Sequence, residues 1–176
     1  MAGNKFLKST KEITLLSVLT TILFVQEQLL AAIPGVQLTV FLIVLYAKKL
    51  GLVRSSIIVV LYVILDNFFM STFSFIYTPV MLIGWLIIPT LLSTVFKKIE
   101  KPILLGLLGI MFSFLYSWLY IIPTCIIANI DFFVYFLTDV VFEIILAICS
   151  FISILVLYKP CSKVFDILMK NKITES

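Results

Sequence analysis

Histidine does not occur in this sequence, and its absence excludes several kinds of site. Imidazole is the commonest side-chain metal ligand and the usual base of nucleophilic triads, so neither kind of site is expected. No HExxH, P-loop or CxxC motif is present. Acidic residues alone can serve an intramembrane aspartyl protease, but the motifs expected for one are missing. We therefore predict a protein that is not an enzyme and holds no metal and no cofactor.

Charged residues are also scarce. They make up 12% of the 176 residues, whereas soluble domains contain roughly 25%. Hydrophobic residues make up 62%, and the mean hydropathy is +1.24. So few charges cannot form the surface of a water-soluble domain, and the sequence therefore predicts an integral membrane protein.

Cysteine is limited to three residues that are far apart in the sequence, Cys125, Cys149 and Cys161. An odd number at such spacing indicates neither a disulfide framework nor a redox or metal-binding pair. We interpret all three as packing residues, because free cysteine behaves as a small hydrophobic side chain.

Breaks in the apolar pattern predict an all-α protein with six transmembrane helices in one domain. The expected spans are residues 12–32, 35–47, 52–70, 78–96, 102–122 and 132–157. The second is short, because a helix from Val36 to Ala47 is only about 18 Å long. Pro34-Gly35 supplies the break before it. Either neighbouring helices bury this segment or the preceding loop dips into the membrane.

The basic residues test this topology, because cytoplasmic loops collect lysine and arginine. All thirteen lie before the first span, between the second and third, between the fourth and fifth, or after the sixth. The three other loops contain none. We therefore predict a multi-pass plasma-membrane protein with both termini in the cytoplasm. The net charge of +4 then comes from anchors that face anionic lipid, and no nucleic-acid partner is expected.

Acidic residues within the spans are the informative ones, because an intramembrane charge costs roughly 2.5–3.5 kcal/mol and usually has a partner. In the sixth span Asp131, Tyr135, Asp139 and Glu143 follow one another at intervals of four, which places them on one stripe of the helix. One interpretation is helix packing through hydrogen bonds, with Asp131 on the helix or in the loop. The other is the polar wall of a pocket open to the outside.

Two further polar clusters lie at the outer ends of other spans. Glu27 lies in a QEQ triplet of the first, and Asp66 precedes Asn67 in the third. A solvated helix end or an interfacial carboxylate explains them as well as a site does. Aromatic residues in the outer halves, such as Trp85 and Tyr135, are expected of a membrane-interface belt in any case. Our hypothesis is an outward-facing pocket formed by Glu27, Asp66, Asn67, Trp85, Tyr135, Asp139 and Glu143.

The chain resembles the substrate-binding S component of an energy-coupling factor (ECF) transporter. The resemblance covers nearly the whole chain and is mainly architectural, with six helices and a short second helix in a chain of this length. Its sequence features are the IPGVQLT stretch at 33–39, the KKLG turn at 48–51 and Gly84-Trp85 in the fourth helix.

The resemblance implies a bacterial membrane protein that captures a vitamin-like micronutrient from outside and releases it by toppling in the membrane. Its partners would be a coupling transmembrane subunit and two ATPase subunits on separate chains. In this family a motif of small residues, commonly Ala-xxx-Ala, docks the first helix on the coupling subunit, and Ser17-xxx-Thr21 takes the matching place. The lack of histidine argues against the nickel and cobalt branch.

Charge also bears on the ligand. Five acids lie at the outer edge or within the spans, and no basic residue lies on the outer side. They favour a ligand that is cationic or rich in hydrogen-bond donors over a carboxylate such as biotin or pantothenate.

Two other functions remain open. A structural or scaffolding membrane protein that resembles the cell-shape protein MreD is also small and six-helical, and it needs no buried site. A stand-alone channel or secondary transporter is the other possibility, although the sequence has no detectable internal repeat of the sort that many carriers show.

Overall fold

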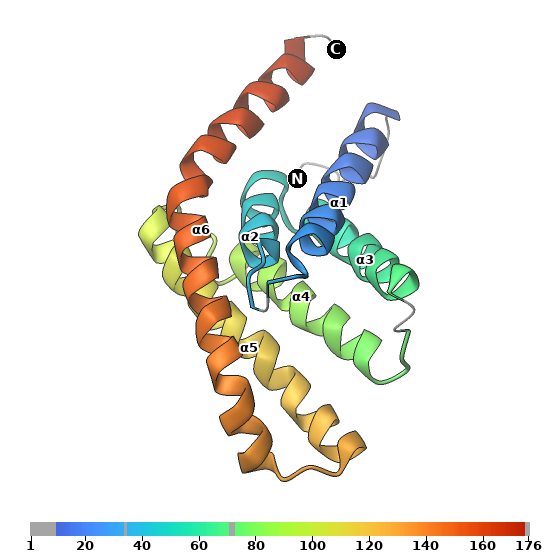
Figure 1. Cartoon of the computed structure of the whole chain (residues 1–176). Coiled ribbons are helices and arrows are strands. Elements are labelled where there is room, and N and C mark those ends of the chain that lie inside the picture. Colours follow the sequence, from blue (N-terminus) through green and yellow to red (C-terminus); the bar gives the residue numbers. More distant parts are fainter. Residues whose placement is uncertain (1–9, 34, 71–72, 175–176) are drawn as a thin grey trace.

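The computed structural model of the chain describes residues 10–33, 35–70 and 73–174, with side chains as far as residue 167. Within these ranges the chain forms six α-helices and no strand (Figure 1). The predicted all-α architecture is therefore confirmed. Lys5, Lys8 and Pro34, and the side chains of Lys170 and Lys172, lie outside the described residues. The helices are α1 (Thr10–Leu30), α2 (Thr39–Leu50), α3 (Leu52–Phe69), α4 (Tyr77–Ser93), α5 (Pro102–Ala128) and α6 (Phe132–Thr174).

Four of these helices are long and apolar enough to cross a membrane, namely α1, α3, α5 and the Phe132–Ile167 part of α6. Helix α4 is also apolar but has 17 residues. Large apolar side chains cover the outside of the bundle: Phe68 is 83% exposed, for example, and Ile126 is 75% exposed. So much exposed apolar surface suits lipid and not water. These are the properties of a membrane protein.

The short helix α2 lies at the centre of the bundle (Figure 1). It contacts each of the other five helices, and every residue from Thr39 to Ala47 is buried. The surrounding helices thus shield it from lipid. Of the two explanations for its short length, the structure shows burial by neighbouring helices. It begins at Thr39, later than the predicted span: Gly35 adopts a left-handed conformation with φ +75°, and residues 35–38 are not helical.

A single glycine separates α2 from α3. Gly51 has φ +79°, a conformation that only glycine adopts readily. Its N–H donates to the Ala47 carbonyl oxygen over 3.2 Å, and its own carbonyl accepts from the Ser55 N–H over 3.2 Å. One residue therefore ends one helix and begins the next, as the predicted KKLG turn requires.

Helices α5 and α6 form a long hairpin (Figure 1). Asn129, with φ 52°, ends α5. Small residues bring the two helices close together: a Cβ atom added at Gly109 would lie 2.5 Å from Ile154 Cδ1. The buried hydroxyls of Ser113 and Ser150 share a hydrogen bond of 2.9 Å across the same interface. This packing fixes the hairpin along its length.

Both helices of the hairpin are longer than predicted. Helix α5 continues through Pro123 to Ala128, and α6 continues through Pro160 to Thr174. The sequence interpretation, based on breaks in the apolar pattern, ended these spans at residues 122 and 157. A proline follows shortly after each of these residues, and proline removes one helical hydrogen bond. Neighbouring contacts allow proline inside membrane helices, and both helices pass through it.

The two ends of the bundle differ in charge. The loops after α1, α3 and α5 lie at the lower ends of these helices in Figure 1, here called the loop end. The start of α1 and the end of α6 lie at the opposite end, here called the basic end. Basic side chains join four helices and the segment after α4 there. The contacts are Lys48 to the Phe96 carbonyl (2.8 Å), Lys49 to Asp166 (2.7 Å) and Arg54 to Glu12 (2.6 Å).

Candidate ligand-binding site

Gln26, near the end of α1, holds the start of α2. Its side-chain oxygen accepts a hydrogen bond from the Leu38 N–H (2.9 Å), and its Nε2 donates to the Thr39 hydroxyl (2.9 Å). These bonds satisfy polar groups of the first turn of α2, whose N-cap residue makes no side-chain capping bond. Gln26 therefore positions the central helix.

The next two residues, Glu27 and Gln28, bind α3. The Tyr62 hydroxyl donates to the Glu27 carboxylate, and Gln28 Nε2 donates to Asp66 Oδ1 over 3.2 Å. Because side chains four residues apart share a helix face, Tyr62 and Asp66 point in the same direction. Two carboxylates thus lie close together between α1 and α3, and the side chains that bind them are uncharged.

Asn67 is buried beside this pair and joins α3 to α4. Its Oδ1 accepts from the Thr78 hydroxyl over 2.8 Å. Its Nδ2 donates to the Val63 carbonyl over 2.9 Å and contacts Met81 Sδ at 3.3 Å. Both ends of the amide are therefore occupied within the protein.

A cavity of about 510 Å³ opens beside these residues. Helices α1 and α3 lie on one side of it and α5 and α6 on the other, and in the described part of the chain the backbones of these two pairs do not come close to each other. Helix α4 contributes residues from its first turns. The lining residues are Glu27, Asp66, Asn67, Tyr77, Met81, Tyr116, Ser117, Tyr120, Thr124, Tyr135 and Asp139. We call this space the tyrosine cavity.

A second cavity, of about 420 Å³, shares Glu27 and Asp66 with the first. It lies under the loop between α1 and α2, and we call it the loop cavity. That loop packs against α6: a Cβ atom at Gly35 would lie 3.0 Å from Ile145 Cγ2, and the Cys149 thiol donates to the Gln37 carbonyl over 3.4 Å. The two acids therefore stand at the boundary between two hollow spaces.

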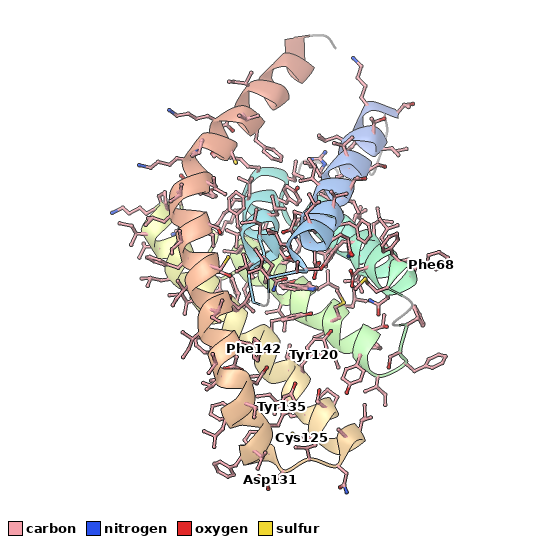
Figure 2. All side chains as sticks on the ribbon, viewed as in Figure 1. Phe68, Tyr120, Cys125, Asp131, Tyr135 and Phe142 are labelled. Atoms are coloured by element: carbon pink, nitrogen blue, oxygen red, sulfur yellow. The ribbon has the colours of Figure 1, made fainter. Side chains whose placement is uncertain are left out.

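Aromatic rings form a continuous series along one side of the tyrosine cavity. The Tyr77 and Tyr120 rings are stacked, with centroids 6.0 Å apart and planes within 10°. Tyr116 lies 5.1 Å from Tyr120, and Trp85 stacks on Tyr116 at 3.9 Å. Trp85 is buried, and its indole N–H has no hydrogen-bond partner in the described structure. Figure 2 shows Tyr120 on α5 and Tyr135 on α6.

The predicted acidic stripe of α6 divides into three environments. Asp131 caps the helix, accepting from the N–H groups of Phe133 (2.9 Å) and Val134 (3.2 Å). Tyr135 and Asp139 line the tyrosine cavity. Glu143 lines neither cavity and is 1% exposed. Its carboxylate interacts with Trp118 of α5 but forms no hydrogen bond within the described residues.

The structure thus brings five of the seven predicted pocket residues to one cavity, and their role in binding stays a prediction. These are Glu27, Asp66, Asn67, Tyr135 and Asp139. Trp85 lies behind the cavity wall, and Glu143 lies apart.

The sequence interpretation did not include Tyr62 or the tyrosines of α4 and α5 in the pocket. The spacing Tyr62-xxx-Asp66 is the available signal, because it places a hydroxyl and a carboxylate on one face of α3. Tyr77, Tyr116 and Tyr120 carry no such signal, since an interface belt predicts tyrosine at these positions equally well.

Ser17 and Thr21, predicted to dock a partner, are exposed on α1. The Thr21 hydroxyl donates to the Ser17 carbonyl oxygen over 2.9 Å, so its donor is used within the helix. Helix α1 contacts α2 and α3 and no other helix in the described part of the chain. The face that carries these two residues is therefore uncovered by the rest of the bundle.

Chemically, the tyrosine cavity combines three carboxylates, several phenol hydroxyls and flat aromatic surface. No lysine or arginine of the described residues lines either cavity. No family model, no curated protein and no solved structure matches this chain.

Proposed function

We propose that this protein is the substrate-binding S component of an ECF-type importer and captures a vitamin-like micronutrient for ATP-driven uptake. The tyrosine cavity is the observation that carries the proposal. Its volume of about 510 Å³ falls within the roughly 300–1,000 Å³ of small-molecule sites. Its lining combines aromatic rings with carboxylate, amide and hydroxyl groups that can orient a ligand.

The position of the cavity supports capture from outside. Glu27 and Asp66 stand near the ends of α1 and α3 that lead into the loop end, whereas the Lys48, Lys49 and Arg54 contacts lie at the basic end. The positive-inside rule assigns the basic end to the cytoplasm. With that orientation both termini are cytoplasmic, and a ligand reaches the two acids from the external side.

The exposed face of α1 supports a partner subunit. Ser17 and Thr21 are small enough to allow close approach of another helix, as small-xxx-small pairs do in membranes. We assign this face to the coupling transmembrane subunit, which in turn binds two ATPase subunits.

Uptake tests the proposal. Cells that express this protein together with an ECF coupling subunit and its two ATPases should accumulate a labelled vitamin, and cells lacking the ATPases should not. Ser17→Leu with Thr21→Leu should prevent uptake but leave ligand binding by the isolated protein unchanged. The lipid-facing pair Val18→Leu with Ile22→Leu is the matched control. Uptake by this chain alone would instead indicate a stand-alone transporter.

Ligand binding separates the proposal from a scaffolding role. A ligand present at 100 times its dissociation constant should stabilise the folded protein by about 2.7 kcal/mol. Thermal unfolding in detergent is therefore measured with a panel of vitamins and their precursors. A scaffolding protein that resembles MreD needs no pocket and should show no stabilisation by any of them.

A further inference from the structure

We infer that the ligand is an organic cation with a flat ring, and that its charged group binds between Glu27 and Asp66 with the ring against the tyrosines. This inference rests on the proposed function, because it assigns a ligand class to the same cavity. Charge, aromatic lining and the arrangement of the two cavities support it separately.

The charge argument begins with the partners of the two acids. Within the described residues Glu27 is bound by the Tyr62 hydroxyl and Asp66 by the Gln28 amide, and both groups are neutral. Asp139 adds a third carboxylate to the same cavity. Acids inside a membrane protein normally face an opposite charge or water. Since no lysine or arginine of the described chain lines the cavity, any positive charge that pairs with these acids comes from the ligand.

The aromatic argument concerns the cavity walls. Four of the seven tyrosines of the chain line this one space, namely Tyr77, Tyr116, Tyr120 and Tyr135. A cation near the face of an aromatic ring is attracted by the negative potential of that face, and this attraction strengthens when water is excluded. The rings of Tyr77 and Tyr120, whose planes lie within 10° of each other, also give the wall flat aromatic surface. Carboxylates beside tyrosine rings form a lining that attracts cations and repels anions.

The arrangement of the cavities locates the charged group. Glu27 and Asp66 line both the tyrosine cavity and the loop cavity, so a ligand in either space meets the same two acids. A ring lies in the tyrosine cavity, which has the aromatic wall, and any further substituent extends under the loop towards Gln37. At the shared boundary the charged group contacts both acids while the rest of the ligand occupies the two cavities.

Matched ligands test the charge preference. The probes are pyridoxamine and 4-pyridoxate, which carry an aminomethyl or a carboxylate group on the same ring, together with thiamine as a second cation and biotin as a second carboxylate. Binding to the full-length protein in detergent is measured as thermal stabilisation and as quenching of tryptophan fluorescence. Trp85 is a suitable reporter because it stacks on Tyr116 at the cavity wall. We expect binding by at least one cation and by neither carboxylate.

Neutral variants test the two acids. Glu27→Gln and Asp66→Asn keep the size of each side chain and an oxygen that accepts from Tyr62 or Gln28. Each should weaken binding of the cation at least tenfold, which corresponds to about 1.4 kcal/mol. Asp131→Asn is the control: it removes an acid from the same end of the bundle, lines neither cavity, and asparagine caps a helix as well as aspartate does. Unfolding without ligand checks that all three variants are folded.

The outcomes separate this inference from the proposed function. If a carboxylate vitamin binds the wild type, or if both neutral variants bind the cation as tightly as the wild type, the inference on charge is wrong and the capture function stands. If folded wild-type protein binds none of the four probes and mediates no ATPase-dependent uptake of any vitamin, both are wrong. Cation binding that Glu27→Gln and Asp66→Asn abolish, but Asp131→Asn does not, supports both.

Discussion

Gly84 on α4 lies directly against the ring of Tyr116 on α5, so closely that a Cβ atom at position 84 would stand 2.8 Å from the Tyr116 Cδ2 atom. The contact allows Tyr116 to lie between Trp85 and Tyr120 in the aromatic series. A small residue in one helix thus determines the position of a cavity wall in the next.

Gly84→Ala should therefore destabilise the protein and displace Tyr116. Overpacking of a well-packed interior typically costs about 1–3 kcal/mol. Thermal unfolding in detergent measures the loss, and the tryptophan emission reports the environment of the stacked Trp85. Ile83→Ala, one residue away on the exposed face, is the control and should change neither signal appreciably. An unchanged unfolding temperature for Gly84→Ala would show that the Tyr116 ring moves without cost.

Replacing either serine of the pair between α5 and α6 should reduce the stability of the protein, but by different amounts. Ser113 donates to the Gly109 carbonyl over 2.9 Å and also shares a bond with Ser150, whereas Ser150 has the Ser113 hydroxyl as its only hydrogen-bond partner in the described structure. Ser113→Ala leaves a buried hydroxyl without a partner, but Ser150→Ala does not. We expect Ser113→Ala to be the more destabilising change.

A double-mutant cycle on these serines measures their coupling. Interhelical hydrogen bonds in membranes average about 0.6 kcal/mol in such cycles, so the double variant should lose less stability than the two single variants added together. Strictly additive losses would contradict a direct bond between the two hydroxyls.

Neighbouring lysines at the end of α2 should differ in their effect on stability. Lys48 Nζ donates to the carbonyl oxygens of Phe96 (2.8 Å) and Lys97 (3.4 Å) just after α4. Lys49 pairs with Asp166, whose side chain is 65% exposed. Lys48→Met should cost about 1–3 kcal/mol because carbonyl oxygens just after α4, one of them partly buried, lose a charged donor. Lys49→Met should cost less than about 1 kcal/mol, as surface ion pairs do.

Salt distinguishes the two lysines further. Unfolding of the Lys49→Met variant and of the wild type should converge as salt concentration rises, because salt screens an exposed pair. The deficit of Lys48→Met should persist, since its donor is partly buried. Equal losses for the two variants would show that Lys48 contributes only its charge.

Neutral replacements of two acids on α6 should have different effects on ligand binding. Asp139 lines the tyrosine cavity and Glu143 does not. Asp139→Asn should therefore weaken binding of the ligand identified by thermal stabilisation, and Glu143→Gln should leave the dissociation constant unchanged. If Glu143→Gln weakens ligand binding more than Asp139→Asn does, the ligand binds deeper between α5 and α6 than the tyrosine cavity.

The helices were largely predictable because a membrane imposes a length and a composition on each span. The predicted starts of α3 at residue 52 and of α5 at residue 102 agree with the structure. Gly51 breaks the helix before α3, and Pro102 is a favourable first residue of a helix. The ends of α5 and α6 were predicted too early. Both helices continue beyond the apolar pattern and through a proline, and a linear pattern does not show whether the surrounding bundle tolerates a proline inside a helix.

The candidate site was predictable in part for a similar reason. Intervals of four residues place Asp139 and Glu143 on one side of α6. They do not show which of the two lies beside a cavity, because that depends on where the facing helix packs against α6. The pairing of α1 with α3 determines that Glu27 meets Tyr62 and that Gln28 meets Asp66. Periodicity describes one helix at a time, whereas a cavity is a property of several.

The burial of α2 on all sides has a consequence for biosynthesis. Its 12 residues are too few to hold a stable transmembrane position alone, and its polar neighbour Gln26 and its lysines find their partners on other helices. During insertion at the translocon, α2 therefore cannot be released into lipid as an independent segment. We expect it to remain there until the helices that surround it have been synthesised, so that they leave together as one assembly unit.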